Sequence, residues 1–213
     1  CSVNAGAFAP TTSIFDSVLF LRLQPVFFII AEKGLRVNGE GGILVEKGGM
    51  FMLKTSRLRL NNLRAGDVEA IVSYRSDPDC ARYQRWEDVS KEAVAAFVKR
   101  FENCKWLSKE EEQHYAIRVE ETLVGDLAYF YTEEDRCVTL GITVAPEHQR
   151  KGYAREILSA VVDAVRETYP ALDIVALIDR ENEASIALFE GLGFERECYA
   201  EKIESYVYAI YGG

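Results

Sequence analysis

The sequence predicts an α/β fold of the α+β kind, with a mixed, mostly antiparallel central sheet flanked by helices. Three strand-like runs, at residues 115–119, 123–131 and 138–144, are separated by short polar stretches, so an antiparallel meander is expected. An amphipathic helix over residues 153–168 follows them. The run at 174–178 is apolar at every position, as in a strand covered on both faces. A chain of 213 residues, 48% of them hydrophobic, is long enough to bury one sizeable core.

Composition excludes several classes of function. A formal net charge of −9 and a pI near 4.9 argue against a nucleic-acid partner and weakly favour a cationic substrate such as an amine. The five cysteines are scattered without a Cys-x-x-Cys pair, and only His114 and His148 could complete a metal site. We therefore expect no bound metal and no disulfide framework, which points to a reducing cytoplasm.

The N-terminal stretch, residues 1–50, differs from the rest of the chain. Its apolar run, 14–31, is interrupted by charged residues and a proline, which makes it a poor membrane span. It also lacks the basic start and the small-residue cleavage site of a signal peptide. We expect residues 1–50 to be an N-terminal extension with no fold of its own and residues 51–213 to form the folded domain. A lipid-anchored Cys1 is the less favoured alternative.

The chain before the meander is expected to hold a strand and two helices. Leucine alternates with arginine over residues 57–63, as in a half-buried strand. Asp67 is expected to cap a helix that runs to Tyr74 and stops before Pro78. Ser90 is expected to cap a second helix, and we expect both helices to cover one side of the sheet. The apolar face of the second helix consists of Val94, Phe97, Val98 and Phe101.

The turn before the helix at 153–168 carries the first motif, Q-x-x-G-x-A, formed by Gln149, Gly152 and Ala154. Unpaired backbone N–H groups at a helix start, together with the helix dipole, favour a bound diphosphate. Gly152 would let the backbone approach phosphate oxygens closely. The alternative is a simple turn glycine beside solvated basic residues. The basic residues that would add positive charge near a phosphate are Arg150, Lys151 and Arg155.

A second motif lies near the end of the chain. We expect a short helix from Glu183 to Gly191 and a last strand from Ser205 to Tyr211. Asn182 ends the apolar run, Ser185 follows it by three residues, and Leu-Gly-Phe stands at 192–194.

The two motifs together resemble the GNAT superfamily of N-acetyltransferases, in which a turn Q/R-x-x-G-x-G/A is followed by N-x-x-S and Leu-Gly-Phe. Residues 57–60 and 81–86 are similar to the RimJ/RimL-type branch, which includes ribosomal-protein-alanine N-acetyltransferases. The resemblance extends over residues 53–208 and leaves out mainly the N-terminal stretch.

The resemblance implies the acyl-CoA N-acyltransferase fold, with a sheet that is splayed at the cofactor cleft, and acetyl-CoA as the cofactor. The strand at 174–178 would diverge from its neighbour and open the cleft for the thioester. Asn182 would contact the cofactor arm, cap the following helix, or do both. The pantetheine arm would run along Ile142, Thr143 and Val144, and the pyrophosphate would be received by Gln149, Arg150, Lys151, Gly152, Tyr153 and Ala154.

The resemblance also implies candidate catalytic residues. Many relatives carry a tyrosine near Phe189 that acts as general acid, and phenylalanine cannot donate a proton. Ser185 is therefore the candidate general acid, although a serine at this place could equally bond the amides of the helix start. Thr139 stands where relatives of this branch often have a glutamate base, which leaves the base open. Tyr83 and Trp86 would wall the acceptor pocket or belong to the core. By residue type alone, the candidate bases are Glu87, Asp126 and Glu133, each of which could instead be a surface carboxylate.

These observations favour an enzyme that acetylates a primary amine, either a protein N-terminus or a small molecule, by direct attack in a ternary complex. The second hypothesis is a non-catalytic acyl-CoA-binding module, because Phe189 and Thr139 stand where an acid or a base is often found. A nucleotide-binding protein is disfavoured because the glycine turn lacks the Gly-x-Gly-x-x-Gly and Gly-Lys-Ser/Thr patterns. We expect no membrane partner, and a homodimer is possible.

Overall fold

The structure is a computed structural model, and it describes residues 52–109 and 112–213. The residues expected to form an N-terminal extension, 1–50, therefore lie outside the described part. The elements in chain order are β1 (Leu53–Lys54), β2 (Arg59–Asn62), η1 (Ala65–Asp67), α2 (Val68–Arg75), α3 (Pro78–Ala81), α4 (Lys91–Phe101), β3 (Gln113–Val119), β4 (Thr122–Thr132), β5 (Cys137–Val144), η2 (Pro146–His148), α5 (Tyr153–Thr168), β6 (Asp173–Asp179), α6 (Glu183–Glu190), β7 (Glu195–Ala200), η3 (Glu201–Ile203) and β8 (Ser205–Ile210).

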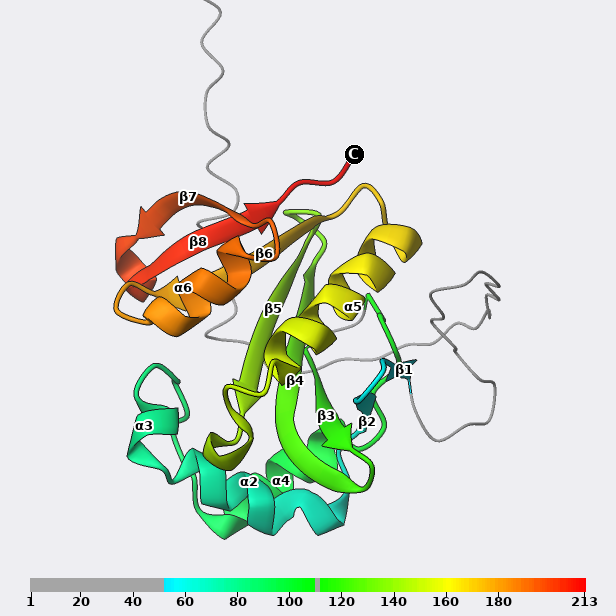
Figure 1. The fold of residues 1–213 in the computed structure, drawn as a ribbon, viewed down its shortest axis with the longest axis vertical. Helices are drawn as coiled ribbons and strands as arrows, with labels where there is room; N and C mark the ends of the chain where they lie inside the picture. The colour runs from blue at the N-terminus through cyan, green and yellow to red at the C-terminus, as the bar shows by residue number, and fades with distance from the viewer. Residues whose placement is uncertain (1–51, 110–111) are drawn as a thin grey trace, which may run out of the picture.

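The strands form one mixed sheet in the order β1-β2-β3-β4-β5-β6-β8-β7. The predicted meander is confirmed, since β3, β4 and β5 pair antiparallel with their neighbours. The β5–β6 pair is parallel, because α5 carries the chain back across the sheet between these two strands. The predicted α/β fold with a mostly antiparallel sheet and flanking helices is therefore correct (Figure 1).

The sheet is splayed between β5 and β6. Their pairing covers only three positions and ends at the pair of Thr139 with Val175. Beyond that pair, β5 stays bonded to β4 as far as Val144, while β6 stays bonded to β8 as far as Asp179. Figure 1 shows the two strands running apart from this point. The last residues of β5 thus have one edge that β6 does not cover.

Two helix layers enclose the sheet. On one face α5 buries the apolar side that its sequence predicts, and α6 packs beside it (Figure 1). On the other face lie α2 and α4, whose buried residues include Ile71, Tyr74, Val94 and Val98. Ser90 caps α4 as expected, since its hydroxyl accepts a hydrogen bond from the Ala93 amide at 3.3 Å.

Asp67 does not cap α2, which corrects the prediction. A turn of 3-10 helix precedes α2, and it directs the Asp67 carboxylate towards the sheet. There one oxygen, Oδ2, accepts hydrogen bonds from the Arg64 amide at 2.8 Å and from the Arg118 guanidinium at 2.6 Å. Arg118 and Asp67 are both almost fully buried, so each needs the other as a charge partner.

The elements that the sequence patterns missed include β7 and α3. The strand β7 begins with Glu195, Arg196 and Glu197, whose exposed polar side chains give no apolar alternation because β7 lies at the edge of the sheet. The short helix α3 starts at Pro78, where the patterns indicated only the end of a helix, and Asp77 caps it by accepting from the Cys80 amide at 2.9 Å. Within 52–109 and 112–213, the structure contains no helix with the length and apolar character of a membrane span.

Gly125 is needed for the close approach of β4 to β5. A Cβ atom at Gly125 would lie far inside the contact distance of the Thr143 carbonyl oxygen, which is backbone and cannot turn away. Gly125→Ala should therefore lower the free energy of unfolding by about 2 to 3 kcal/mol, measured by chemical denaturation. The matched control is Gly141→Ala in the adjacent strand, where the nearest atom is the Ala128 Cβ at 3.4 Å. Equal unfolding midpoints for the two variants would contradict this account.

Candidate active site

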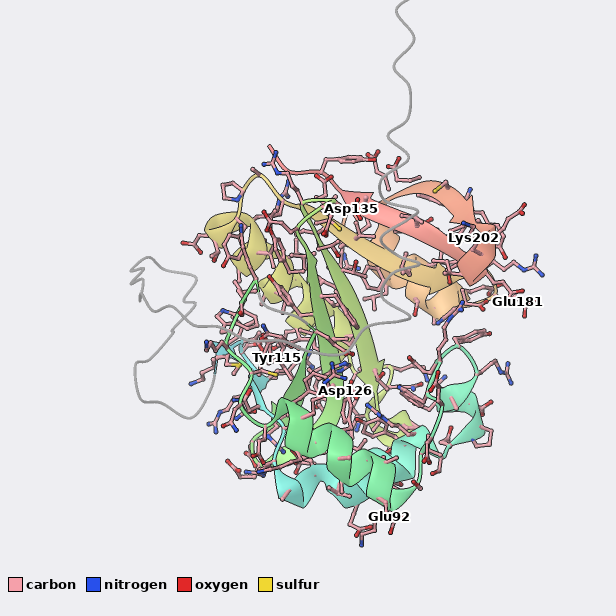
Figure 2. The ribbon with its side chains drawn as sticks, turned by 180° about the vertical axis from the view of Figure 1, so that it is seen from behind. Glu92, Tyr115, Asp126, Asp135, Glu181 and Lys202 are labelled. Carbon is pink, nitrogen blue, oxygen red and sulfur yellow. The ribbon has the colours of Figure 1, made fainter. Side chains whose placement is uncertain are left out.

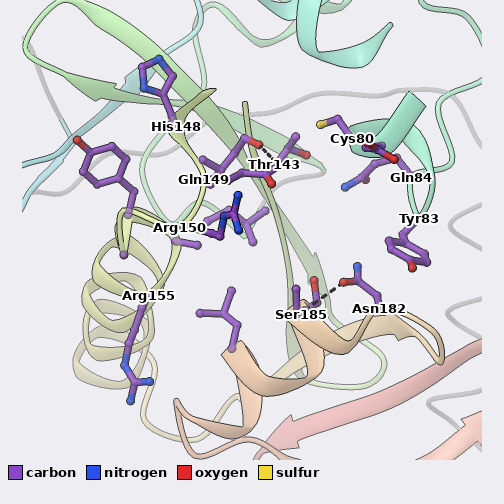
Figure 3. A pocket seen from close by; sticks show the side chains of 18 residues that line it. Cys80, Tyr83, Gln84, Thr143, His148, Gln149, Arg150, Arg155, Asn182 and Ser185 are labelled. Carbon is purple, nitrogen blue, oxygen red and sulfur yellow. Dashed lines mark hydrogen bonds between the residues drawn. The ribbon is translucent and has the colours of Figure 1, made fainter. Parts of the chain in front are cut away.

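A cavity of about 420 Å³ opens where β5 and β6 separate (Figure 3). Four segments form its walls: the end of β5, the turn that follows it before α5 and, from distant parts of the sequence, the start of α6 and the segment around α3. The residues that line it are Asp79, Cys80, Tyr83, Gln84, Ile142, Thr143, Val144, His148, Gln149, Arg150, Gly152, Tyr153, Ala154, Arg155, Asn182, Ala184, Ser185 and Leu188.

The start of α5 borders this cavity with open backbone amides. Gly152 is the N-cap residue in the left-handed conformation, with φ 79°, and it makes no side-chain cap hydrogen bond. The first helical hydrogen bond of α5 runs from the Glu156 amide to the Gly152 carbonyl, at 3.1 Å. The amides of the helical residues before Glu156 therefore have no partner within the helix. A helix start that no side chain closes is suited to a bound anion.

The turn before α5 is held by an ion pair that the sequence patterns did not indicate. Arg57 Nε lies 2.6 Å from Glu156 Oε2, and Arg57 Nη1 donates to the Lys151 carbonyl at 3.0 Å. The guanidinium of Arg57 also lies over the Tyr153 ring, 4.9 Å from its centroid. This pair fixes the turn to the connection between β1 and β2, about a hundred residues earlier in the chain.

The pKa of Glu156 reflects these contacts. Partial burial acts to raise it, but hydrogen bonds from the Thr55 hydroxyl, the Arg57 amide and guanidinium and the Ser56 hydroxyl outweigh burial and lower it to about 2. Glu156 is therefore a carboxylate at neutral pH, and it anchors the first turn of α5.

The start of α6 forms the opposite wall. The Asn182 side-chain oxygen accepts from the Ser185 amide at 3.1 Å, so Asn182 is the cap of α6 (Figure 3). The Ser185 hydroxyl lines the cavity and has no hydrogen-bond partner among the described residues, so it is not used in capping. Phe189 points into the core, where its ring packs edge-on against Phe194 with centroids 5.0 Å apart.

Tyr83 and Trp86 have different surroundings. Tyr83 lines the cavity, and its hydroxyl donates to the Glu181 carbonyl at 3.1 Å, which links the segment after α3 to the loop before α6. Trp86 does not line the cavity. It packs against the Arg75 guanidinium, 4.9 Å from the ring centroid, and beside Tyr74, as a core residue would. Of the two alternatives for Trp86, the structure supports the core.

Of the residues predicted to hold the cofactor, Lys151 alone does not line the cavity. Its side chain is exposed in the turn, and its carbonyl is bound by Arg57. Gln149 closes the turn by donating to the Val144 carbonyl at 3.0 Å. The sequence patterns missed the wall formed by Asp79, Cys80 and Gln84, because the short helix that holds Asp79 and Cys80 has no helical pattern of its own and Gln84 lies in the segment after it.

The three candidate bases also differ in environment. Glu87 and Glu133 are exposed, as surface carboxylates are. Asp126 is 4% exposed and lies beneath α2, where the Tyr74 hydroxyl donates to it. Asp126 is therefore not a surface residue, and its burial requires an explanation.

The mixed sheet that parts beside an uncapped helix start defines an acyltransferase-type domain. The acetyltransferase (GNAT) domain family matches residues 57–195, and the chain belongs to this family. It is therefore an acetyltransferase, and its cofactor is acetyl-CoA, as the sequence predicts.

Relatives agree with this assignment, and solved structures share the fold. The chain is 28% identical over 150 residues to the uncharacterized N-acetyltransferase YoaA of Bacillus subtilis. The alignment covers 68% of this chain and 84% of that protein. A GNAT-family acetyltransferase from Bacillus anthracis has the same fold, with a TM-score of 0.63 and 24% identity over 74% of this chain and 96% of that one. The fold is also similar to spermidine N-acetyltransferase from Vibrio cholerae in complex with CoA and spermine, with a TM-score of 0.59 and 22% identity over 74% of this chain and 95% of that one.

Glu156→Gln should destabilise the protein at neutral pH and not in strong acid. The folded-state pKa of Glu156 lies below its ordinary value of 4.5, so the stabilisation is complete above that pH and is lost as the pH falls towards about 2. Because Arg57 is half exposed, we expect a loss of only about 1 kcal/mol at pH 7, measured by urea unfolding. The control is Glu167→Gln, an exposed carboxylate on the same helix. A loss of equal size in both variants would show that the Arg57 pair contributes nothing.

Proposed function

We propose that this protein transfers the acetyl group of acetyl-CoA to a primary amine, at a protein N-terminus or on a small molecule, by direct attack in a ternary complex. One observation carries the proposal: a single cavity is bordered both by the uncapped start of α5 and by the wall around α3. An anionic cofactor and a second substrate could therefore meet inside it. Its acceptor would enter from the side of Tyr83.

The cofactor would be held by the segments that line the cavity. The amides at the start of α5, with Arg150 beside them, would bind the pyrophosphate, since they lack a capping partner in the described chain. The edge of β5 that β6 leaves open, at Ile142–Val144, would pair with the pantetheine arm as an added strand does. Asn182 and Ser185 would border the arm from the other side.

The chain's own residues would contribute mainly by positioning. Bound acetyl-CoA supplies an activated thioester carbonyl. The walls from β5 and α3 would hold the amine beside it, and a free amide of β5 would polarise the carbonyl oxygen. Ser185 would donate a proton to the leaving thiolate, because its hydroxyl faces the cavity without a partner in the described chain. A thiol is a good leaving group, so this help is modest.

The RimJ/RimL-type branch and the amine acceptor are supported by similarity alone. Residues 57–60 and 81–86 carry the resemblance to that branch. A similar fold, with a TM-score of 0.61 and 24% identity, belongs to a Vibrio cholerae protein with a proposed ribosomal-protein-serine acetyltransferase activity. The test is free-thiol release from acetyl-CoA with an alkyl monoamine, a polyamine and a peptide with a free N-terminus. Binding of acetyl-CoA without thiol release for any amine would favour the non-catalytic module instead.

Gly152→Glu should weaken acetyl-CoA binding by more than about tenfold in calorimetric titration, because it puts bulk and negative charge at the proposed phosphate site. The matched control is Gly193→Glu. Gly193 has a similar left-handed φ, 88° against 79°, with open space around it and no place in the cavity lining. Both variants carry a similar backbone strain of about 1 kcal/mol. Wild-type affinity in Gly152→Glu would show that the phosphate site is misplaced.

Ser185→Ala should lower kcat with little change in acetyl-CoA affinity. The cap of α6 uses the Ser185 amide and not its hydroxyl, so the variant keeps the helix start intact. We expect a decrease of about tenfold, at the low end of general acid catalysis, because the leaving group needs little assistance. Ser159→Ala, on the exposed side of α5, is the control. A wild-type kcat in Ser185→Ala would remove Ser185 from the chemistry.

A further inference from the structure

A row of polar side chains crosses the sheet face beneath α2 and α4. It starts at Glu112, just before β3, and His114 on β3. It continues through Asp126 on β4 to Thr143 on β5. Asp126 and Thr143 are direct cross-strand partners, and His114 pairs with Ala128, so His114 and Asp126 are diagonal neighbours on the same face. Figure 2 shows Asp126 on the sheet, next to α4. One end of the row, Thr143, lines the cavity.

The row is buried among apolar groups. Asp126 is 4% exposed and His114 is 9% exposed. Aromatic rings surround His114, with the centroids of Phe97 and Phe101 at 4.8 and 4.6 Å from its own. Burying a carboxylate and an imidazole in such a layer is costly unless they are paired, and apolar side chains of similar size would fill the space without that cost. Buried titratable groups beside a cleft are candidates for a functional role.

The hydrogen bonds of His114 define which of its nitrogens can accept a proton. Nε2 lies 2.8 Å from Glu112 Oε1, and Glu112 is fixed in turn by Arg100 at 3.2 Å. Nδ1 is buried, lies 3.7 Å from Asp126 Oδ1 and has no hydrogen-bond partner in the described chain. With the proton of neutral His114 on Nε2, the lone pair of Nδ1 faces Asp126.

The row also reaches the cavity. Thr143 lines it directly, and Cys80, another lining residue, lies close enough that the charge of Asp126 adds to burial and to Asp77 in raising the pKa of its thiol to about 11. Asp126 itself is not part of the lining. A proton that moves between Asp126 and the cavity would therefore have to pass through its cross-strand partner Thr143 or through one water molecule.

We propose that Asp126 and His114 take up the proton that the acceptor ammonium must lose before it attacks the thioester. This rests on the proposed function. The N–H bond of the ammonium breaks as an O–H bond forms on Asp126, through Thr143 or a water molecule. Asp126 passes that proton to Nδ1 of His114, and the imidazolium is stabilised by Glu112. After product release, the proton returns by the same path to water in the cavity. Asp126 and His114 are positioning residues in this scheme, since they act through another group.

The charges around His114 favour this direction of transfer. Burial acts to lower the pKa of His114, but the carboxylates of Asp126 and Glu112 outweigh it and raise the pKa above the ordinary 6.5. Burial acts to raise the pKa of Asp126, but His114, Arg75 and Tyr74 outweigh it and lower the pKa. Of the two groups, His114 is therefore the stronger base, and a proton that reaches Asp126 passes on to the imidazole. The titratable and charged groups around His114 are Glu112, Asp126, Tyr74 and Arg75 of α2, Arg100 of α4 and the thiol of Cys104.

The experiment measures kcat/KM between about pH 5 and 9 for the amine that gives thiol release with the wild-type protein. Because only neutral His114 can accept a proton, wild-type kcat/KM should rise with pH through a pKa above 6.5. Asp126→Asn should lower kcat at pH 7 by about a hundredfold with unchanged acetyl-CoA affinity. His114→Gln should remove the acidic limb of the profile. Glu87→Gln and Glu133→Gln, at exposed carboxylates, should behave as the wild type.

A second readout does not depend on turnover. The chain has two histidines, so ¹⁵N-histidine NMR can follow His114 in the wild-type protein, with His148→Gln for assignment. We expect the Nε2–H form of the neutral ring and a pKa above 6.5. The opposite tautomer, or a pKa at or below 6.5, would overturn the relay.

The outcomes for the relay and for the proposed function are distinct. A wild-type pH profile in both Asp126→Asn and His114→Gln, with full turnover, would overturn the relay and leave the amine acetyltransferase standing. Absence of thiol release by the wild-type protein with every amine would overturn the proposed function, and the relay with it.

Discussion

The separation of β5 from β6 after the pair of Thr139 with Val175 is the constraint on which the rest of the site depends. Each strand keeps its other neighbour, so the sheet stays continuous while a gap opens on one edge of β5. Gln149 satisfies the Val144 carbonyl on that edge, and the other backbone groups along it must be satisfied by water or by a ligand. The chain then returns through α5, which brings an open helix start to the same gap. An acyl-CoA cleft thus arises from the path of the backbone, and side chains refine it.

Two pairs of charged or titratable side chains lie beside the cleft. The pair of Arg57 with Glu156 fixes the turn before α5 in a geometry that the glycine alone would not impose, so the helix start is organised before any anion arrives. On the opposite face of the sheet, the buried residues Asp126 and His114 lie beside Thr143, which lines the cavity. In the function that we propose, the first pair would support cofactor binding, and the second would take up the substrate's proton.

Much of the fold was predictable because its signals are local. The helix at 153–168 was predicted with the bounds that α5 has, since its apolar residues repeat at helical spacing and a glycine precedes it. The three strands of the meander followed from short polar separators between apolar runs. Of the candidate site, the turn at 149–154 and the cap at Asn182 were evident for the same reason, because each depends on residues within a few positions of one another.

The sequence by itself thus determined most of the elements, the family and the motifs at the two helix starts. Only the tertiary structure decided what those motifs face. The edge strand β7 has no apolar alternation to reveal it, and Asp126 differs from an exposed carboxylate only through the helices that cover it. The Arg57–Glu156 pair joins residues about a hundred positions apart. Such contacts arise from the packing of distant segments, and a local pattern of residue types contains no information about them.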